Sequence, residues 1–473
     1  MTSHADIDSA LAALRAGFAS GITRPVDSRL EQLARLQRGI ERDGDLLADA
    51  LAADLGKPRA ESLITELGTL TQELSHIRHN LASWLQPSAF GLGTLLMPAS
   101  GHIHREPLGT VLVIAPWNYP MQLSLMPVIG AIAAGNTVML KPSEITPHCS
   151  AALARLVSEH MDERWVQVIE GGIDETTHIL RQRFDHIVFT GNGTVGRVVA
   201  RAAAEHLTPT TLELGGKSPV YVDRGMDLKA VAARLTWAKF TNAGQTCVAP
   251  DYVMGESAVL TDLADEIRQQ IAHMYGEDPQ TSGQYGRIVS DKQFDRLSGL
   301  LDASRDRVVH GGGADRADRF IEPTLLRLPS ASEGALETPI MGEEIFGPLL
   351  PLIPVTGVSE AIGIITSGDK PLTAMVFTDD PEVERAFTEQ TSSGSLAVNF
   401  ALAHAGSSLM PFGGVGESGM GTYHGRASIE ALTHPKPVVK KPLKPETLSM
   451  IFPPYGRRTG LLGRLMGVRL RRC

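Results

Sequence analysis

With 473 residues, the chain is too long for one ordinary hydrophobic core, so we expect two or three domains. Its 42% hydrophobic residues, 21% charged residues and 47 glycines are typical of a soluble α/β protein, and without an apolar run of about 20 residues no membrane span is expected. The net charge is −9. The three cysteines are widely spaced and form neither a disulfide framework nor a metal cluster. The N-terminus is polar and unlike a signal peptide. We therefore expect a reduced, cytoplasmic protein.

The charge is distributed unevenly along the chain. Residues 436–473 hold ten Lys and Arg against one acidic residue, Glu446, and so carry +9, whereas the remainder carries −18. The acidic body, and a tail whose basic residues are not interleaved with aromatic ones, argue against nucleic-acid binding. The basic C-terminal tail, 441–473, ends in a mixture of apolar residues and Arg over 461–472. Two interpretations stay open for it: a solvated or locally packed tail, or a weak peripheral contact with an anionic membrane.

The N-terminal part of the chain is predicted to be helical. Apolar residues recur at helical spacing in 7–18, 30–40 and 46–55. Residues 86–105 lose this period and contain several Gly and Pro, which indicates an excursion away from the main body.

Short apolar runs then alternate with helical segments. Apolar runs bounded by Gly or Pro are typical of buried parallel strands, and strand–helix alternation favours a doubly wound sheet. After residue 218 the alternation continues less regularly, which predicts a second α/β domain. The first set of expected strands is 109–116, 136–141, 166–169 and 186–190.

A glycine-rich turn suggests where a dinucleotide binds. The sequence Gly191-Asn-Gly-Thr-Val-Gly196 matches G-x-G-x-x-G, follows a predicted strand and precedes a predicted helix. Such glycines let the backbone approach a pyrophosphate at a helix N-terminus, where free N–H groups and the helix dipole attract anions. The alternative is a plain tight turn. In the usual dinucleotide fold an acid about 20 residues further on binds the ribose, a position that Glu213 fills.

A second candidate ribose site competes with this assignment. Lys141-Pro-Ser-Glu144 directly follows a predicted strand. At the carboxyl end of a parallel strand, its amine and its carboxylate are suited to bind ribose hydroxyls. The alternative is a solvated Lys/Glu turn. If this site holds the ribose, Glu213 is free for chemistry.

Cys247 is the candidate nucleophile. It lies in Asn242-Ala-Gly-Gln-Thr-Cys-Val-Ala-Pro250, and Glu213 stands 34 residues upstream, before a Gly-Gly turn. A thiol and a separate carboxylate base are what two-step acyl transfer to water requires. Asn118, between two prolines and directly after a strand, is suited to donate to a developing oxyanion. Taken singly, a cysteine is more often a small buried hydrophobe and an asparagine of this kind a turn residue. No metal is expected, because neither His404 nor His424 has a ligand partner at metal spacing.

Together these segments resemble the aldehyde dehydrogenase superfamily over roughly residues 5–440. The landmarks run in the family's order from Pro116-Trp-Asn-Tyr-Pro120 to Pro411-Phe-Gly-Gly414. The segments 244–252 and 413–421 are most similar to its class 3 branch, which includes fatty, aromatic and coniferyl aldehyde dehydrogenases. The resemblance implies a homodimer and an α/β fold with a Rossmann-like cofactor domain, a second α/β catalytic domain and a β-hairpin oligomerisation arm. The implied ranges are 1–83 and 106–213 for the NAD(P)-binding domain, 214–425 for the catalytic domain, and 84–105 and 426–440 for the arm.

The resemblance also assigns roles by motif. It implies Cys247 as nucleophile, Glu213 as base, and Asn118 with the backbone N–H of Cys247 as oxyanion hole. The implied cofactor is NAD, because Glu144 would repel a 2′-phosphate, with NADP also open because members of this branch often accept it. The residues implied to bind the cofactor are Trp117, Lys141, Glu144, Gly191, Asn192, Val195, Gly196, Glu344 and Phe346.

Two positions depart from the family's pattern. Gly193 stands where many members have Thr or Pro, and Phe400 stands where this branch often has Asp. Phe400 either makes the substrate tunnel more apolar, together with Tyr119 and Met126, or serves packing. To react as a thiolate, the thiol of Cys247 also needs a lowered pKa, and Lys217 and the bound cofactor are the candidates for lowering it.

The expected reaction is the NAD(P)-dependent oxidation of an aromatic or medium- to long-chain aliphatic aldehyde to the acid, through a thiohemiacetal and a thioester on Cys247. Two alternatives keep the scaffold: a dehydrogenase that passes the acyl group to coenzyme A, and one that acts on a semialdehyde or a phosphorylated aldehyde. A third alternative is a non-enzymatic binding or structural protein that reuses the fold.

Overall fold

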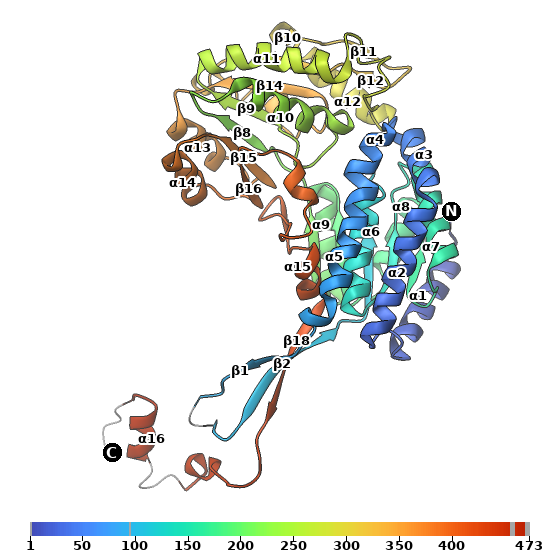
Figure 1. Cartoon of the computed structure of the whole chain (residues 1–473), viewed down its shortest axis with the longest axis vertical. Helices are drawn as coiled ribbons and strands as arrows, with labels where there is room; N and C mark the ends of the chain where they lie inside the picture. Colours follow the sequence, from blue (N-terminus) through green and yellow to red (C-terminus); the bar gives the residue numbers. More distant parts are fainter. Residues whose placement is uncertain (1, 94–95, 455–458, 469–473) are drawn as a thin grey trace. The chain divides into compact units, whose positions relative to one another are not determined.

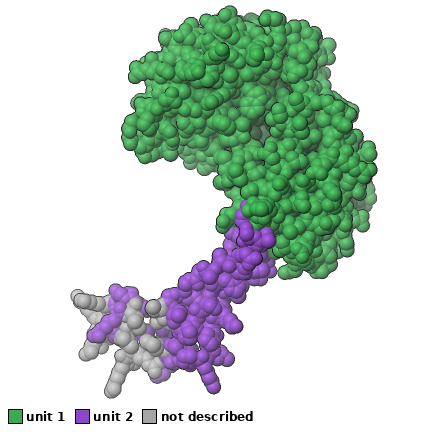
Figure 2. All heavy atoms as spheres, in the orientation of Figure 1, with its two compact units in different colours: residues 1–81, 107–432 green, residues 82–106, 433–473 purple. Residues whose placement is uncertain are grey.

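The structure is a computed structural model that describes residues 2–93, 96–454 and 459–468. The chain divides into two compact units, shown in different colours in Figure 2. Unit 1 comprises residues 1–81 and 107–432, and unit 2 comprises residues 82–106 and 433–473. Within the described residues, no helix combines the length and the apolar character needed to cross a membrane.

The first half of unit 1 is built on a six-stranded sheet with the order β17-β7-β6-β3-β4-β5. The five strands from β7 to β5 are parallel, and β17 joins the edge antiparallel to β7. All residues of β3 and β4 are buried, as expected for parallel strands covered on both faces. The predicted doubly wound sheet is therefore confirmed. Its strands are β3 (Thr110–Ile114), β4 (Thr137–Lys141), β5 (Val166–Val168), β6 (His186–Thr190), β7 (Thr210–Glu213) and β17 (Gly419–Met420).

Helices pack around this sheet (Figure 1). Helix α1 contributes Ile7, Leu11 and Leu14 to a core that also contains Leu112 of β3 and Phe189 of β6. Helix α6 is buried along almost its whole length and ends at a left-handed glycine, Gly135. The helices of this half are α1 (His4–Ala19), α2 (Val26–Arg42), α3 (Gly44–Leu55), α4 (Arg59–Ser62), a π-helix (Leu63–Leu67), α5 (Gly68–Trp84), α6 (Gln122–Ala134), α7 (Pro147–His160), α8 (Ile173–Leu180) and α9 (Gly193–Glu205).

The second half of unit 1 is another α/β arrangement, as the sequence predicts. Its seven-stranded sheet has the order β10-β13-β14-β9-β8-β15-β16, and every pair is parallel except β10 with β13. The strands are β8 (Pro219–Val222), β9 (Tyr252–Gly255), β10 (Val308–His310), β13 (Thr324–Arg327), β14 (Leu349–Pro354), β15 (Thr373–Phe377) and β16 (Ser395–Val398), and β11 (Ala314–Asp315) with β12 (Phe320–Ile321) forms a separate ribbon. The helices are α10 (Leu228–Phe240), α11 (Ser257–Tyr275), α12 (Asp291–Asp302), α13 (Val358–Ser367) and α14 (Pro381–Gln390).

Unit 2 contains the segments that the sequence assigns to an arm. The strands β1 (Ser88–Phe90), β2 (Ser100–Pro107) and β18 (Thr433–Lys440) form a three-stranded sheet, which contains the expected hairpin of β1 and β2. Residues 426–432 were expected in the arm, but they belong to unit 1. Most of them form helix α15 (Gly425–Ala431), which packs on α6. The packing is so close that a Cβ at Gly130 would lie 2.6 Å from Ser428 Cβ. In the tail, α16 covers Thr459–Leu465, and residues 469–472 of the proposed membrane segment lie outside the described residues.

Candidate active site

The loop that carries Cys247 is held in a strained conformation. Between α10 and Cys247, the residues Asn242, Ala243 and Gly244 take left-handed φ values of 55°, 51° and 76°. Such a conformation in non-glycine residues persists only where the surroundings over-determine it. At Gly244 a side chain is excluded, since a Cβ there would lie 2.4 Å from the carbonyl oxygen of Gly347. The loop therefore packs closely against the segment of Gly347 just before Cys247.

The Gln245 side chain locks this loop from within. Its Nε2 donates to the carbonyls of Asn242 and Arg287, each at 2.9 Å, and its Oε1 accepts from Val289 N at 2.9 Å. The amide is fully buried, and three hydrogen bonds leave it one arrangement. Cys247 is thus presented from a rigid turn.

Asn118 reaches the same loop from the end of β3. Its Nδ2 donates to Gln245 O at 3.0 Å, and its own carbonyl accepts from Asn242 Nδ2 at 2.8 Å. Only 3% of Asn118 is exposed. The structure therefore brings the predicted oxyanion donor beside the predicted nucleophile, although they stand far apart in the sequence.

Glu213 is the last residue of β7 and is buried to 2% exposure. Among the described residues, neither of its carboxylate oxygens has a hydrogen-bond partner. Burial raises the pKa of Glu213 well above its ordinary value, because the buried surroundings disfavour the charged form. An unpartnered buried carboxyl is unfavourable unless a reaction uses it, which makes it a candidate catalytic group.

The thiol of Cys247 is also shifted toward its neutral form. Burial raises the pKa of Cys247 to about 12, and the negative charges of Glu344 and Glu213 add to this shift. Lys217, a sequence candidate for lowering this pKa, instead forms an ion pair with Asp251 and donates to Glu343 O at 2.8 Å. The resting thiol is thus protonated at neutral pH.

The carboxyl of Glu344 makes the reactivity of this thiol pH-dependent in a testable way. Burial raises the pKa of Glu344 to about 8, so its charge acts on Cys247 only above that pH. We expect E344Q to leave the alkylation rate of Cys247 by iodoacetamide unchanged near neutral pH and to increase it near about pH 9, because the thiolate is the reactive species. The rate is followed by mass spectrometry of the Cys247 peptide.

The matched control for this prediction is the neighbouring carboxyl of Glu343. Its side chain is exposed and pairs with Arg296 at 2.9 Å. E343Q should leave the alkylation profile unchanged at both pH values. Equal profiles for E344Q and E343Q would contradict the electrostatic coupling between Glu344 and Cys247.

The glycine-rich turn at 191–196 joins β6 to the start of α9. Asn192 caps α9, its side chain accepting from Val195 N at 3.0 Å. A Cβ at Gly191 would lie 2.6 Å from the Phe189 ring, and one at Gly196 would lie 2.8 Å from Leu214, so both glycines permit close packing of helix and sheet. The N-terminus of this helix is suited to an anion.

Lys141 and Glu144 meet at the carboxyl end of β4. Lys141 Nζ lies 3.2 Å from Glu144 Oε2 and donates to Pro142 O at 2.7 Å. Burial lowers the pKa of Lys141, and Glu144 remains 47% exposed. A buried amine beside an exposed carboxylate, at the edge of the sheet that carries α9, is suited to a ribose.

A pocket of about 500 Å3 is lined by the start of α9 and by residues of the second α/β half of unit 1. Glu344 lines this pocket beside Gly215, where an added Cβ would lie 2.0 Å from the Glu344 carboxylate. The rings of Trp117 and Phe346 pack edge to face, with their centroids 5.3 Å apart, but neither residue lines this pocket. The sequence-predicted residues that line it are Asn192 and Glu344, next to Gly193, Gly215, Gly216 and Lys217.

Cys247 opens onto a different cavity, of about 350 Å3, whose surface is mostly apolar. Tyr119 lines it as expected, whereas Met126 is buried inside α6 and Phe400 is 45% exposed against His404. Thr246, Val248 and Phe412 lie in motifs that the sequence singles out, whereas most of the other walls come from separate elements and carry no motif. Besides Cys247 and Tyr119, the walls are Ile64, Thr65, Thr69, Gln72, Gln122, Leu123, Trp237, Thr246, Val248, Leu402, Ala403, Ala405, Gly406, Ser407, Phe412, Tyr423 and His424.

Side chains suited to a metal gather elsewhere. Within the described part of the chain, one group of three, Asp43, Glu159 and His160, brings its ligand atoms within 4.8 Å of one another. His160 Nε2 already pairs with Asp43 at 2.8 Å, and none of the three lines either pocket described above. His404 bonds to Thr373 and Ser395.

A doubly wound sheet with a glycine turn at a helix N-terminus, joined to a second α/β half whose Cys247 opens onto a cavity, is typical of a nucleotide-dependent oxidoreductase. The sequence profile of the Aldehyde dehydrogenase family matches residues 1–438, and the chain belongs to that family. It is an NAD(P)-dependent aldehyde dehydrogenase.

Several relatives are similar over almost the whole chain. The dimeric NADP-preferring aldehyde dehydrogenase of Rattus norvegicus is 42% identical over 93% of this chain and 96% of its own. The 4,4'-diaponeurosporen-aldehyde dehydrogenase of Staphylococcus aureus is 41% identical over 93% of this chain and 95% of its own. A solved structure described as the substrate-bound state of Staphylococcus aureus AldH superposes with a TM-score of 0.94 at 39% identity, covering 98% of this chain and 100% of that one.

Proposed function

We propose that this enzyme oxidises aromatic or medium- to long-chain aliphatic aldehydes through a covalent intermediate on Cys247. One observation carries the proposal: Cys247 opens onto a mostly apolar cavity, while Asn118 and Glu213 approach its loop from the other lobe. Apolar walls favour an apolar substrate, because each buried CH2 group contributes about 0.8 kcal/mol.

In the proposed reaction the thiol of Cys247 loses its proton to solvent, its sulfur bonds to the aldehyde carbon, and the C=O π bond opens so that the carbonyl oxygen becomes an oxyanion. The free N–H of the Asn118 amide and the backbone N–H of Cys247 stabilise this oxyanion. After oxidation the acyl group remains on sulfur as a thioester. Glu213 then takes a proton from water, the water oxygen bonds to the acyl carbon, and the C–S bond breaks to release the acid.

The residues present fit a nicotinamide dinucleotide. The N-terminus of α9 offers N–H groups for the pyrophosphate, Lys141 and Glu144 offer ribose partners, and Glu344 lines the same pocket as Asn192 at the start of α9. Further members of the proposed set are Trp117, Gly191, Val195, Gly196 and Phe346. When bound, NAD(P)+ accepts the hydride that leaves the aldehyde carbon. The exposed carboxylate of Glu144 would repel a 2′-phosphate, which favours NAD, although relatives of this chain are NADP-preferring.

Two alternatives on the same scaffold find less support. A semialdehyde or phosphorylated aldehyde would require a cation, and no Lys or Arg is among the described residues that line the substrate cavity. Transfer of the acyl group to coenzyme A would not require a buried base such as Glu213. A binding protein without turnover would not need to retain three such groups around one strained loop.

A panel of aldehydes assayed without coenzyme A tests the proposal. We expect kcat/KM to rise with aliphatic chain length by up to about three- to fourfold per methylene, from the free energy of burying each CH2 group. Pentanal should be preferred to succinic semialdehyde, which adds a carboxylate that the cavity cannot pair. A strict requirement for coenzyme A, or a preference for the semialdehyde, would contradict the proposal.

Two proposals concern unit 2. A homodimer through the sheet of β1, β2 and β18 fits the similarity of this chain to the dimeric NADP-preferring enzyme of Rattus norvegicus. A weak contact of the tail with anionic membranes rests on its +9 charge over 436–473. Together with a cytoplasmic location, both stay predictions.

A further inference from the structure

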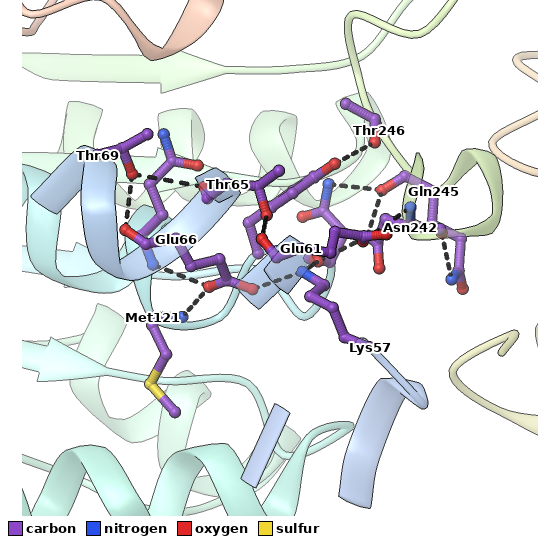
Figure 3. A network of polar contacts seen from close by, with 12 residues as sticks. Lys57, Glu61, Thr65, Glu66, Thr69, Met121, Asn242, Gln245 and Thr246 are labelled. Carbon is purple, nitrogen blue, oxygen red and sulfur yellow. Dashed lines mark hydrogen bonds and ion pairs between the residues drawn. The ribbon is translucent and has the colours of Figure 1, made fainter. Parts of the chain in front are cut away.

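A buried ammonium lies beneath the segment that carries Asn118. Lys57, in the turn between α3 and α4, is 1% exposed, and its Nζ lies 2.5 Å from Glu66 Oε1. Figure 3 shows these two side chains pointing toward each other, with Met121 on the far side of Glu66. In the sequence Lys57 stands between Gly56 and Pro58, residue types that end a helix, and nothing there indicates Glu66 as its partner.

The Lys57 ammonium contacts two consecutive residues beside the nucleophile. It donates to the carbonyl of Asn118 at 3.3 Å and lies 4.1 Å from the centre of the Tyr119 ring. Tyr119 OH in turn hydrogen-bonds Thr246 Oγ1 at 2.7 Å, next to Cys247 in the chain. An ammonium has three donors, and Glu66, Asn118 and the Tyr119 ring account for them.

Glu66 anchors the other end of the same segment. Its Oε2 accepts from the backbone N–H groups of Met121 at 2.8 Å and Gln122 at 3.1 Å, at the start of α6. The whole stretch 118–122 therefore rests on one buried ion pair. Apolar residues of similar volume often stabilise a fold as well as such a pair does, so its use here points to a requirement for a fixed geometry.

We propose that Lys57 and Glu66 are positioning residues for the reaction, which hold the backbone at 118–122 so that the Asn118 amide faces the oxygen of the aldehyde bound to Cys247. The inference rests on the proposed role of Asn118 and acts through it. Neither side chain lines the substrate cavity or the nucleotide pocket.

The double variant K57M/E66Q tests the proposal without leaving an unpaired buried charge. The E66Q amide oxygen can still accept from Met121 N, so the fold has its main anchor. We expect the rate constant of the first burst of NADH to fall about ten- to hundredfold, less than the 10²–10³ that removal of an oxyanion donor costs. The Kd for NAD, measured by fluorescence titration, should stay unchanged.

Arg29 provides a matched control. It is a buried cation, 5% exposed, that donates to Thr23 O at 2.8 Å and to Ala133 O at 3.2 Å, at the opposite end of α6. R29M should lower the melting temperature but leave the burst rate unchanged at temperatures where the protein is folded. A fall in the burst rate for R29M equal to that of K57M/E66Q would overturn the positioning role, since any loosening of α6 would then suffice.

A double-mutant cycle with N118A separates positioning from general stability. N118A alone should lower the burst rate; if it does not, the proposed function fails. If it does, adding K57M/E66Q to N118A should cause little further loss, because the amide that the pair positions is gone. Additive losses, or a wild-type burst rate for K57M/E66Q alone, would overturn the inference and leave the role of Asn118 intact.

Discussion

Replacing Cys247 by serine is expected to lower aldehyde oxidation by roughly 10³-fold or more, because a hydroxyl is a far poorer nucleophile than a thiolate at neutral pH. NAD binding should persist, since Cys247 lines the substrate cavity and not the nucleotide pocket. Steady-state formation of NADH and fluorescence titration of NAD measure the two effects separately.

The second described cysteine is the control for this experiment. Cys149 is fully buried in α7, and its backbone N–H donates to Asp54 Oδ2 at 2.8 Å. Burial raises the pKa of its thiol, so it has no route to thiolate chemistry. C149S should retain wild-type kcat. Substantial turnover by C247S would remove Cys247 from the role of nucleophile.

Replacing Glu213 by glutamine should separate the two halves of the reaction. The thiol attack and one burst of NADH should survive, while steady turnover should fall by roughly 10²–10⁴-fold, because only the attack of water requires the base. Rapid-mixing absorbance at the NADH band resolves the burst from the steady state. Loss of the burst as well would point to an earlier role for Glu213, or to ribose binding.

The pH dependence gives the same assignment an independent test. Burial raises the pKa of Glu213, so the carboxylate that acts as base forms at a higher pH than it does for an ordinary glutamate. The wild-type rate of deacylation should therefore increase with pH over a range shifted above that of an ordinary glutamate, and E213Q should lack this increase. E73Q is a matched control, since Glu73 is also a buried carboxyl with a raised pKa. Its burst and its pH profile should be those of the wild type.

Features that depend on a few neighbouring residues could be predicted from the sequence. The turn at 191–196 begins a helix after a strand, as predicted, because Asn192 supplies a side-chain cap and the glycines admit close packing. Lys141 and Glu144 meet because they stand three positions apart at the end of a strand. The two α/β sheets likewise follow from apolar runs whose period needs no knowledge of distant contacts.

Contacts between distant segments could not be predicted in this way. The sequence alone does not indicate that Lys57 is buried on Glu66, or that Trp237, Leu402 and Tyr423 line one cavity. Residues 426–432 were expected in the arm, but α15 packs on α6, where Gly130 leaves room for Ser428. Lys217 was a candidate for lowering the pKa of the Cys247 thiol, but it forms an ion pair with Asp251 instead.

The sequence by itself therefore determined the α/β class, the helix that begins at the glycine-rich turn and the candidates for nucleophile, base and amide. Only the tertiary structure decided how these groups lie and what charge they carry. The physical reason is that a pKa depends on burial and on neighbouring charges, which distant segments supply. The thiol of Cys247 acquires its pKa of about 12 from burial and from Glu344 and Glu213, residues that only the packed chain brings to it.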